Sequence, residues 1–217
     1  MPDSYQTILR PGVAEFTEKK SRFISEARPV ADEAEARAFL EEIRKKYWDA
    51  THNVWAYQLG ERHETTRYSD DGEPAGTAGQ PVLNVLKGEG LRNVAVVVTR
   101  YFGGTLLGAG GLVRAYGRAA RECVEAAGIA RMTLYHRYRV TLDYPTAGKV
   151  EYECGKQGVT LLAKGYTDCV AFSLCVEDPG QGPFLDSVQE LSGGRAEVEE
   201  LPDVFGALVD GQLVFAE

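Results

Sequence analysis

The spacing of hydrophobic residues changes several times along the chain, and each spacing predicts a different element. Over residues 32–46 apolar side chains recur three or four positions apart, which predicts an amphipathic helix. Residues 53–60 and 91–102 are predicted strands, and the second contains four valines, as buried strands do. Helical spacing returns over residues 112–127, and Gly128 marks the predicted end of this helix.

Two further stretches of the first half are dominated by turn signals. The first 30 residues contain short predicted strands, interrupted by Pro11 and Gly12 and by the charged turn at Lys19 and Lys20. Residues 61–86 are dense in turn-forming residues and predict turns.

After Arg131 a second set of elements is predicted. A strand, a helix, two strands, a helix and a strand follow in that order, over residues 135–142, 145–156, 159–166, 168–177, 182–191 and 195–201. This βαββαβ order is the split βαβ arrangement of ferredoxin-like folds. The predicted fold class is therefore α+β with two domains, 1–132 and 133–205, followed by a C-terminal tail over 206–217.

The composition is that of a folded protein, but its charge is unevenly placed. The 217 residues are 44% hydrophobic and 26% charged, with a mean hydropathy of -0.26, which allows one large or two small domains. Residues 1–132 carry 18 basic and 18 acidic side chains, whereas residues 133–217 carry 6 and 14. This asymmetry indicates two units with different partners, and any nucleic-acid site must be a local basic patch.

Neither export, membrane insertion nor a metal centre is expected. No run approaches the ~18–20 apolar residues of a membrane-spanning helix, and the N-terminus lacks the pattern of a signal peptide, so we expect a cytoplasmic protein without a membrane partner. The three histidines are scattered, and no two cysteines form a C-x-x-C pair. Therefore no metal and no cofactor is assigned.

The densest chemical signal is the stretch 99–116, in which a buried strand leads through a glycine-rich loop into a helix. Glycines allow close approach to bare amides, and a helix N-terminus attracts anions. The spacing fits neither a P-loop nor G-x-G-x-x-G, which disfavours an NTPase or a dinucleotide enzyme. The loop glycines are Gly103, Gly104, Gly108, Gly110 and Gly111.

Basic and aromatic residues surround this loop. Arg114, Arg118 and Arg121 share one stripe of the predicted helix, and Arg100 precedes the glycines. Arginine suits phosphate, and aromatic rings offer stacking surfaces for bases, so we predict an RNA or phosphate site here. Alternatively, the arginines form a solvated face and the aromatics belong to the core. The aromatic candidates are Tyr101, Phe102 and Tyr116.

A second constellation lies upstream of the loop. Asp70, Asp71 and Glu73 are three carboxylates within four residues, which could hold a hydrated Mg²⁺, meet the arginines or simply form a turn. His52 could act as a base, or it could be an ordinary packed or capping histidine. These four residues form a secondary candidate site, and no catalytic residue is assigned.

Three stretches together resemble the IMPACT family, in its bacterial YigZ branch. They are Asp49–His52 (DATH), Ser69–Pro81 (SDDGEPAGTAGQP) and Val96–Tyr116 (VVVTRYFGGTLLGAGGLVRAY). The resemblance covers most of residues 15–127 closely and the C-terminal part in outline. It implies that the first domain has the fold of ribosomal protein S5 domain 2 and that the second is ferredoxin-like.

The resemblance also bears on function. Eukaryotic members are linked to control of translation initiation, and the paired folds are similar to adjacent domains of elongation factor G. We therefore expect a non-catalytic, cytosolic RNA- or ribosome-binding protein that acts in regulation of translation, without sequence-specific DNA binding. The alternative is an enzyme acting on a phosphorylated small molecule, because the S5-like fold also carries small-molecule kinases.

Overall fold

The computed structural model describes residues 4–60, 64–209 and 211–215, and the chain divides into two compact units, 1–131 and 132–217. The first unit contains β1 (Ser4–Ile8), β2 (Gly12–Glu18), β3 (Ser21–Pro29), α1 (Glu33–Lys46), β4 (His52–Leu59), β5 (Thr65–Ser69), α2 (Gly79–Gly88), β6 (Val94–Tyr101) and α3 (Ala109–Ala127). In the described part of the chain, no helix is long and apolar enough to cross a membrane.

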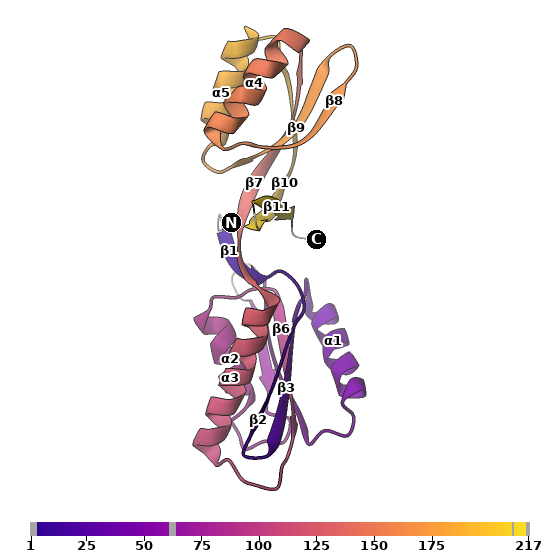
Figure 1. The fold of residues 1–217 in the computed structure, drawn as a ribbon, viewed down its shortest axis with the longest axis vertical. Coiled ribbons are helices and arrows are strands. Elements are labelled where there is room, and N and C mark those ends of the chain that lie inside the picture. The colour runs from indigo at the N-terminus through magenta and orange to yellow at the C-terminus, as the bar shows by residue number, and fades with distance from the viewer. Residues whose placement is uncertain (1–3, 61–63, 210, 216–217) are drawn as a thin grey trace. The chain divides into compact units, whose positions relative to one another are not determined.

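The first unit is built on an antiparallel five-stranded sheet in the order β2-β3-β6-β4-β5. The hairpin between β2 and β3 turns through Lys19 and Lys20, both with positive φ. Helices α2 and α3 cover one face of the sheet and α1 covers the other (Figure 1). The sheet is therefore buried on both sides.

Strand β6 shows why its sequence is a continuous apolar run. Val94, Val96 and Val98 pack with α2 and α3, whereas Ala95 and Val97 pack with α1. Successive side chains of a strand point to opposite faces, so a strand between two helical layers needs apolar residues at every position.

Two elements of the first unit begin within residues 61–86, the stretch predicted as turns. Residues 65–69 form β5 and residues 79–88 form α2, while residues 61–63 lie outside the described residues. Helix α2 begins at Gly79 and contains Pro81 in its first turn, where the missing N–H costs no hydrogen bond. Glycine and proline at its start hid a helix whose apolar residues pack into the core.

The second unit contains β7 (Ile129–Leu142), which starts three residues before the boundary, then α4 (Tyr144–Gln157), β8 (Thr160–Tyr166), β9 (Val170–Glu177), α5 (Gln181–Ser192), β10 (Glu197–Val209) and β11 (Gln212–Phe215). The sheet runs β11-β10-β7-β9-β8. Taking β7, β8, β9 and β10 as strands one to four, the spatial order is 4-1-3-2, with α4 and α5 packed into one core. The predicted α+β class is confirmed, an S5 domain 2-like unit followed by a ferredoxin-like one.

The C-terminal end differs from the prediction. Residues 206–217 were expected to form a tail, but β10 continues to Val209, and β11 pairs with it antiparallel from Gly206↔Phe215 to Val209↔Gln212. The physical reason is that Gly211 adopts a positive φ of 79°, which lets the chain reverse and satisfy the edge of β10.

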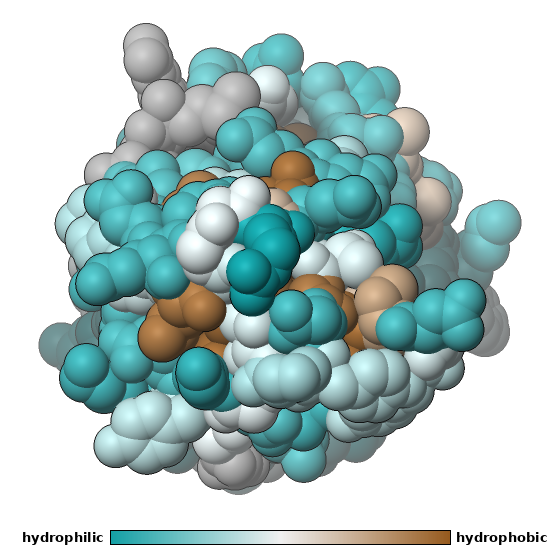
Figure 2. Space-filling view, turned by 90° about the horizontal axis from the view of Figure 1, so that it is seen from above, coloured by the Kyte–Doolittle hydropathy of each residue, from teal (hydrophilic) through white to brown (hydrophobic). Residues whose placement is uncertain are grey.

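Figure 2 shows one face of the molecule in space-filling form. Hydrophilic residues predominate on this face, and hydrophobic residues appear as small separate patches (Figure 2). Scattered apolar residues are normal on protein surfaces, whereas large contiguous patches mark interfaces. This face therefore gives no reason to propose an apolar docking surface.

Candidate functional site

The sequence motifs of the first unit meet at one end of its sheet. In the strand register Phe23 of β3 and His52 of β4 lie on either side of Arg100 of β6. Arg100 is in phase with Val94, Val96 and Val98, so its side chain lies on the face covered by α2 and α3. A cation is thus placed on the core side of the sheet.

Arg100 is the centre of a buried cluster, which we define as Glu73, Arg100 and Tyr116. The guanidinium is 2.6 Å from Glu73 Oε1, and Tyr116 donates a hydrogen bond of 2.8 Å to the same oxygen. Arg100 also donates to Ser21 Oγ at 3.2 Å. Arg100 is 4% exposed and Glu73 8%. Burial, followed by the charge of Glu73, raises the pKa of Tyr116, so this phenol remains protonated.

His52 lies beside the buried cluster with a defined orientation. Its Nδ1 is 2.7 Å from the carbonyl oxygen of Asp71, and its Nε2 is 3.8 Å from Glu73 Oε1. A carbonyl oxygen can only accept, so Nδ1 carries a proton, and in the neutral ring Nε2 is an acceptor. Gly72, at a φ of 86°, lies against this ring, and a Cβ added at this glycine would be 3.5 Å from Nδ1.

A hollow of about 360 Å³ opens next to the buried cluster. His52, Glu73 and Arg100 form its polar side. The beginning of α3 forms part of its wall, through Gly108 and Ala109. The remaining wall is mainly apolar and includes Pro74, Phe102, Leu106, Leu107 and Leu112. Such a combination of a mostly apolar lining and a few convergent polar groups is typical of small-molecule sites.

The three predicted carboxylates do not converge on one point. Asp70 accepts from the amides of Gly76, Ala78 and Gly79 and thereby orders the start of α2. Asp71, at a φ of 45°, accepts from the amide of Asn53. Asp71 also lies 3.9 Å from the exposed Arg44, and Glu73 pairs with the buried Arg100. Among the described residues no group of three or more His, Cys, Asp or Glu side chains is placed to hold a metal ion, so this turn does not support a magnesium site.

Removal of divalent metal should therefore leave the fold unchanged. Each carboxylate of the turn is already satisfied by protein groups, so a chelated metal would have no folding free energy to withdraw. We expect the thermal midpoint of the full chain to be the same with and without excess EDTA, measured by circular dichroism. A decrease of many degrees would mean that a structural metal site exists.

The glycines of the loop have different roles. A Cβ on Gly103 would lie 2.0 Å from the backbone carbonyl of Lys20, so this position needs glycine for close packing. Gly104 and Gly108 have φ values of 79° and 78°, which favour glycine. At Gly110 a Cβ would meet no atom within 4 Å.

The two residues before these glycines form hydrogen bonds to the segment that precedes β4. Tyr101 donates to Asp49 Oδ1 at 2.8 Å, and the amide of Phe102 donates to Thr51 Oγ1 at 3.0 Å. Phe102 as a whole residue remains 44% exposed. Of the predicted aromatic platforms, Tyr116 is fully buried and is not one.

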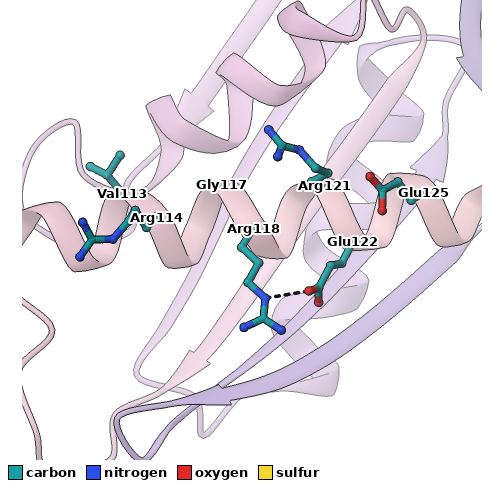
Figure 3. Close-up of a pocket in the computed structure, with 7 residues that line it drawn as sticks. All are labelled: Val113, Arg114, Gly117, Arg118, Arg121, Glu122 and Glu125. Carbon is teal, nitrogen blue, oxygen red and sulfur yellow. Dashed lines mark hydrogen bonds and ion pairs between the residues drawn. The ribbon is translucent and has the colours of Figure 1, made fainter.

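The arginine stripe forms a separate feature, a shallow groove of about 430 Å³ along α3 (Figure 3). Arg118 pairs with Glu122 at 2.7 Å, and its guanidinium lies 4.1 Å from the ring centre of Phe16. In the described structure Arg114 and Arg121 make no hydrogen bond or ion pair. We call this feature the arginine groove, lined by Val113, Arg114, Gly117, Arg118, Arg121, Glu122 and Glu125.

The single surface predicted from sequence is therefore divided in two. Arg100 is not available to a phosphate polymer, because it is buried and paired with Glu73. His52 and Glu73, predicted as a secondary site, line the hollow together with Arg100. Sequence reasoning missed Leu106, which is 82% exposed beside the hollow; a leucine within a glycine-rich loop was the available signal.

Comparison with known proteins gives matches over both units. Residues 19–124 match the family described as the Impact N-terminal domain, and residues 140–195 match a domain of unknown function, DUF1949. The chain is 40% identical over 200 residues to "IMPACT family member YvyE" of Bacillus subtilis (strain 168), covering 92% of each protein. It is 32% identical to "IMPACT family member YigZ" of Escherichia coli (strain K12), over 83% of this chain and 89% of that one.

A solved structure and a eukaryotic protein extend the comparison. The structure, described as the crystal structure of an hypothetical protein, has a TM-score of 0.59 and 30% identity, and covers 93% of this chain and 99% of that one. "Protein IMPACT" of Oryctolagus cuniculus is 36% identical over 98 residues, 43% of this chain and 30% of that protein. The matches define a two-domain α+β protein that joins an Impact N-terminal domain to a DUF1949 domain. The chain belongs to the IMPACT family, as the sequence motifs predicted.

Proposed function

We propose that the protein is a non-catalytic, cytoplasmic RNA-binding protein that acts in regulation of translation and contacts the phosphate backbone through the arginine groove. The observation that carries the proposal is a pair of exposed guanidinium groups, those of Arg114 and Arg121 on either side of Gly117, which have no partner among residues 4–60, 64–209 and 211–215. They are exposed in a protein whose net charge is -8. Arginine binds phosphate through two parallel hydrogen bonds, and no carboxylate of the described structure pairs with either group.

The spacing along α3 supports contact with an extended strand. Arg114 and Arg121 are seven residues apart, which is about 10 Å along a helix axis. Phosphates of a stacked strand are spaced at about 3.4 Å per nucleotide, so the two side chains can reach different phosphates of one strand. Gly117 lies between them without a side chain, which leaves the groove open to a backbone.

The remaining charges of the groove are less favourable to RNA and limit its affinity. Glu122 neutralises Arg118, and Glu125 adds a second carboxylate. Residues 133–217 carry 14 acidic against 6 basic side chains, which opposes non-specific binding. Binding through this surface should thus be weak and strongly dependent on salt.

Substitution of Arg114 and Arg121 by alanine should weaken binding to single-stranded RNA of any sequence. Each lost phosphate contact reduces the slope of log affinity against log salt by about 0.7 on single strands, so the double variant should lose roughly 1.4. Fluorescence anisotropy of a labelled oligoribonucleotide, repeated at several salt concentrations, measures this slope. Arg118→Ala should have a smaller effect, because Arg118 is already paired.

A matched control lies on the opposite side of the sheet. Arg37 and Arg44 on α1 are exposed and pair with Glu33 and Glu41, so their replacement by alanine removes the same charge from another face. This control should bind like the unmodified chain. Equal slopes for the two double variants, or no RNA binding at low salt, would refute the arginine groove as the site.

The second candidate function is an enzyme acting on a phosphorylated small molecule. The observation that favours it is the hollow beside His52, Glu73 and Arg100. The two functions use different surfaces of the first unit, so they can be tested separately.

A further inference from the structure

We propose that the hollow of the first unit binds a small amphipathic anion, a phosphate or carboxylate joined to an apolar body. The anionic group would contact the first amides of α3, and the apolar body would lie against Phe102 and Leu106. His52, Glu73 and Arg100 supply the polar wall between these two ends, and the Glu73 carboxylate in this wall is paired with Arg100. This inference rests on the second candidate function, whose site is the same hollow, and it does not depend on RNA binding in the arginine groove.

The end of the site that would bind the anionic group is the start of α3. This helix has 19 residues, its N-cap is Gly108, no side chain caps it, and its first turn contains no acidic residue. The first amides of a helix lack intrahelical acceptors and carry a partial positive charge. At Gly108 and Gly110 a Cβ would meet no atom within 4 Å, so a ligand can approach the backbone there.

The start of α2 differs from the start of α3 in the acceptor of its first amides. There Asp70 accepts from the amides of Ala78 and Gly79 at 3.1 and 2.8 Å. A protein carboxylate therefore satisfies the first amides of α2. Within the described residues no side-chain carboxylate does so for the first amides of α3, beside the hollow.

The end of the site that would bind the apolar body contains apolar side chains that remain exposed to water in the folded protein. Leu106 is 82% exposed and Phe102 44%, and both line the hollow. Leu107 and Leu112 also line the hollow and are buried. Covering apolar side chains stabilises a complex by about 25 cal/mol for each Å² removed from water, so an apolar body fits this side.

The polar wall contains a buried donor without a partner. Arg100 is 4% exposed and lines the hollow, and within the described residues its Nε has no hydrogen-bond acceptor. A buried unsatisfied donor is costly, and a ligand oxygen would satisfy it. His52 Nε2, whose ring is held by the Asp71 carbonyl, is the acceptor for a ligand hydroxyl.

The proposal is tested by nuclear magnetic resonance of the ¹⁵N-labelled full chain with four probes: phenyl phosphate, benzoate, inorganic phosphate and phenol. We expect phenyl phosphate or benzoate to shift the amides of Phe102 and of residues 108–112, and whichever binds more tightly identifies the anionic group. Inorganic phosphate should bind at least about tenfold more weakly, because it covers no apolar surface. If neither aromatic anion shifts these amides, the proposal is wrong.

Substitutions at two positions test the anion-binding end and the apolar end of the site separately. Gly110→Asp places a carboxylate at the start of α3, where it suits the helix dipole but repels an anion, whereas Gly110→Asn is the neutral control of the same shape. We expect Gly110→Asp to bind phenyl phosphate at least about tenfold more weakly than Gly110→Asn, with phenol unaffected. Leu106→Ser should weaken phenyl phosphate about fivefold and leave inorganic phosphate unchanged.

Each part of the proposed site has a result that would overturn it. Equal binding by the two Gly110 variants would overturn the anionic end, and equal binding of phenyl phosphate by Leu106→Ser and the unmodified chain would overturn the apolar end. Shifts confined to residues 117–125 would place the anion in the arginine groove and overturn the proposal. Since Leu106 is mostly exposed and the Gly110 position is open, thermal midpoints should confirm that all variants fold.

Discussion

Replacement of Glu73 by alanine is expected to lower the free energy of unfolding by about 3–5 kcal/mol. Glu73 is the carboxylate partner of Arg100 inside the first unit, and it accepts from Tyr116 at the same oxygen. Removal of one partner leaves a buried charge without compensation, which costs far more than the pair contributes. Urea denaturation followed by circular dichroism measures the change.

The double variant Glu73→Leu/Arg100→Met is the informative comparison. Removal of both charges leaves no unpaired ion, and apolar replacements of a buried pair are often neutral or stabilising. We therefore expect the double variant to recover most of the stability lost by Glu73→Ala. The exposed Glu125, replaced by alanine, should change stability by less than about 0.5 kcal/mol. A Glu73→Ala variant as stable as the Glu125 control would contradict the buried ion pair.

Replacement of Gly103 by alanine is expected to destabilise the first unit by roughly 3 kcal/mol. The added Cβ would lie 2.0 Å from the carbonyl carbon and oxygen of Lys20, in the turn between β2 and β3. Backbone atoms cannot move aside as a flexible side chain can, so the loop and the hairpin must separate. The amide of Gly103, which donates to Ser21 Oγ at 3.3 Å, would also be displaced.

Gly110→Ala is the matched control from the same motif. Its Cβ would meet no atom within 4 Å, and the residue lies in the first turn of α3. Alanine restricts the unfolded chain and suits a helix, so this variant should be equal to the unmodified chain or more stable by about 0.5 kcal/mol. Thermal and urea unfolding of Gly103→Ala and Gly110→Ala measure the two changes in stability. Equal losses of stability would contradict the different roles of these glycines.

Particular residues show how far local sequence determined the structure. Asp32 accepts from the Glu35 amide at 2.8 Å as the N-cap of α1, and Lys45 and Lys46 lie in its last turn. Capping and amphipathic spacing act over a few residues, so they are readable without the fold. For the same reason the βαββαβ order of the second unit was predictable, whereas the register that adds β11 was not.

The candidate site shows where local reasoning ended. Arg100 was predicted to face a phosphate, yet it is in phase with Val94, Val96 and Val98, and that alternation already placed it on the buried face. The acceptor that makes this burial possible, Glu73, lies 27 residues away. Within the acidic turn, the backbone of Asp71 at a φ of 45° helps to direct neighbouring carboxylates to different partners.

By itself the sequence determined the family, the α+β class, the two sets of elements and the residues that carry charge and chemistry, because these follow from spacing, composition and motifs. Only the tertiary structure decided which of those residues meet. It brought Arg100 and Tyr116 to the same oxygen of Glu73, and it opened a hollow beside His52. Within the described part of the chain, it left the guanidinium groups of Arg114 and Arg121 without a hydrogen bond or ion pair. The physical reason is that long-range pairing depends on strand register and helix packing, which fix distances between residues that no local pattern relates.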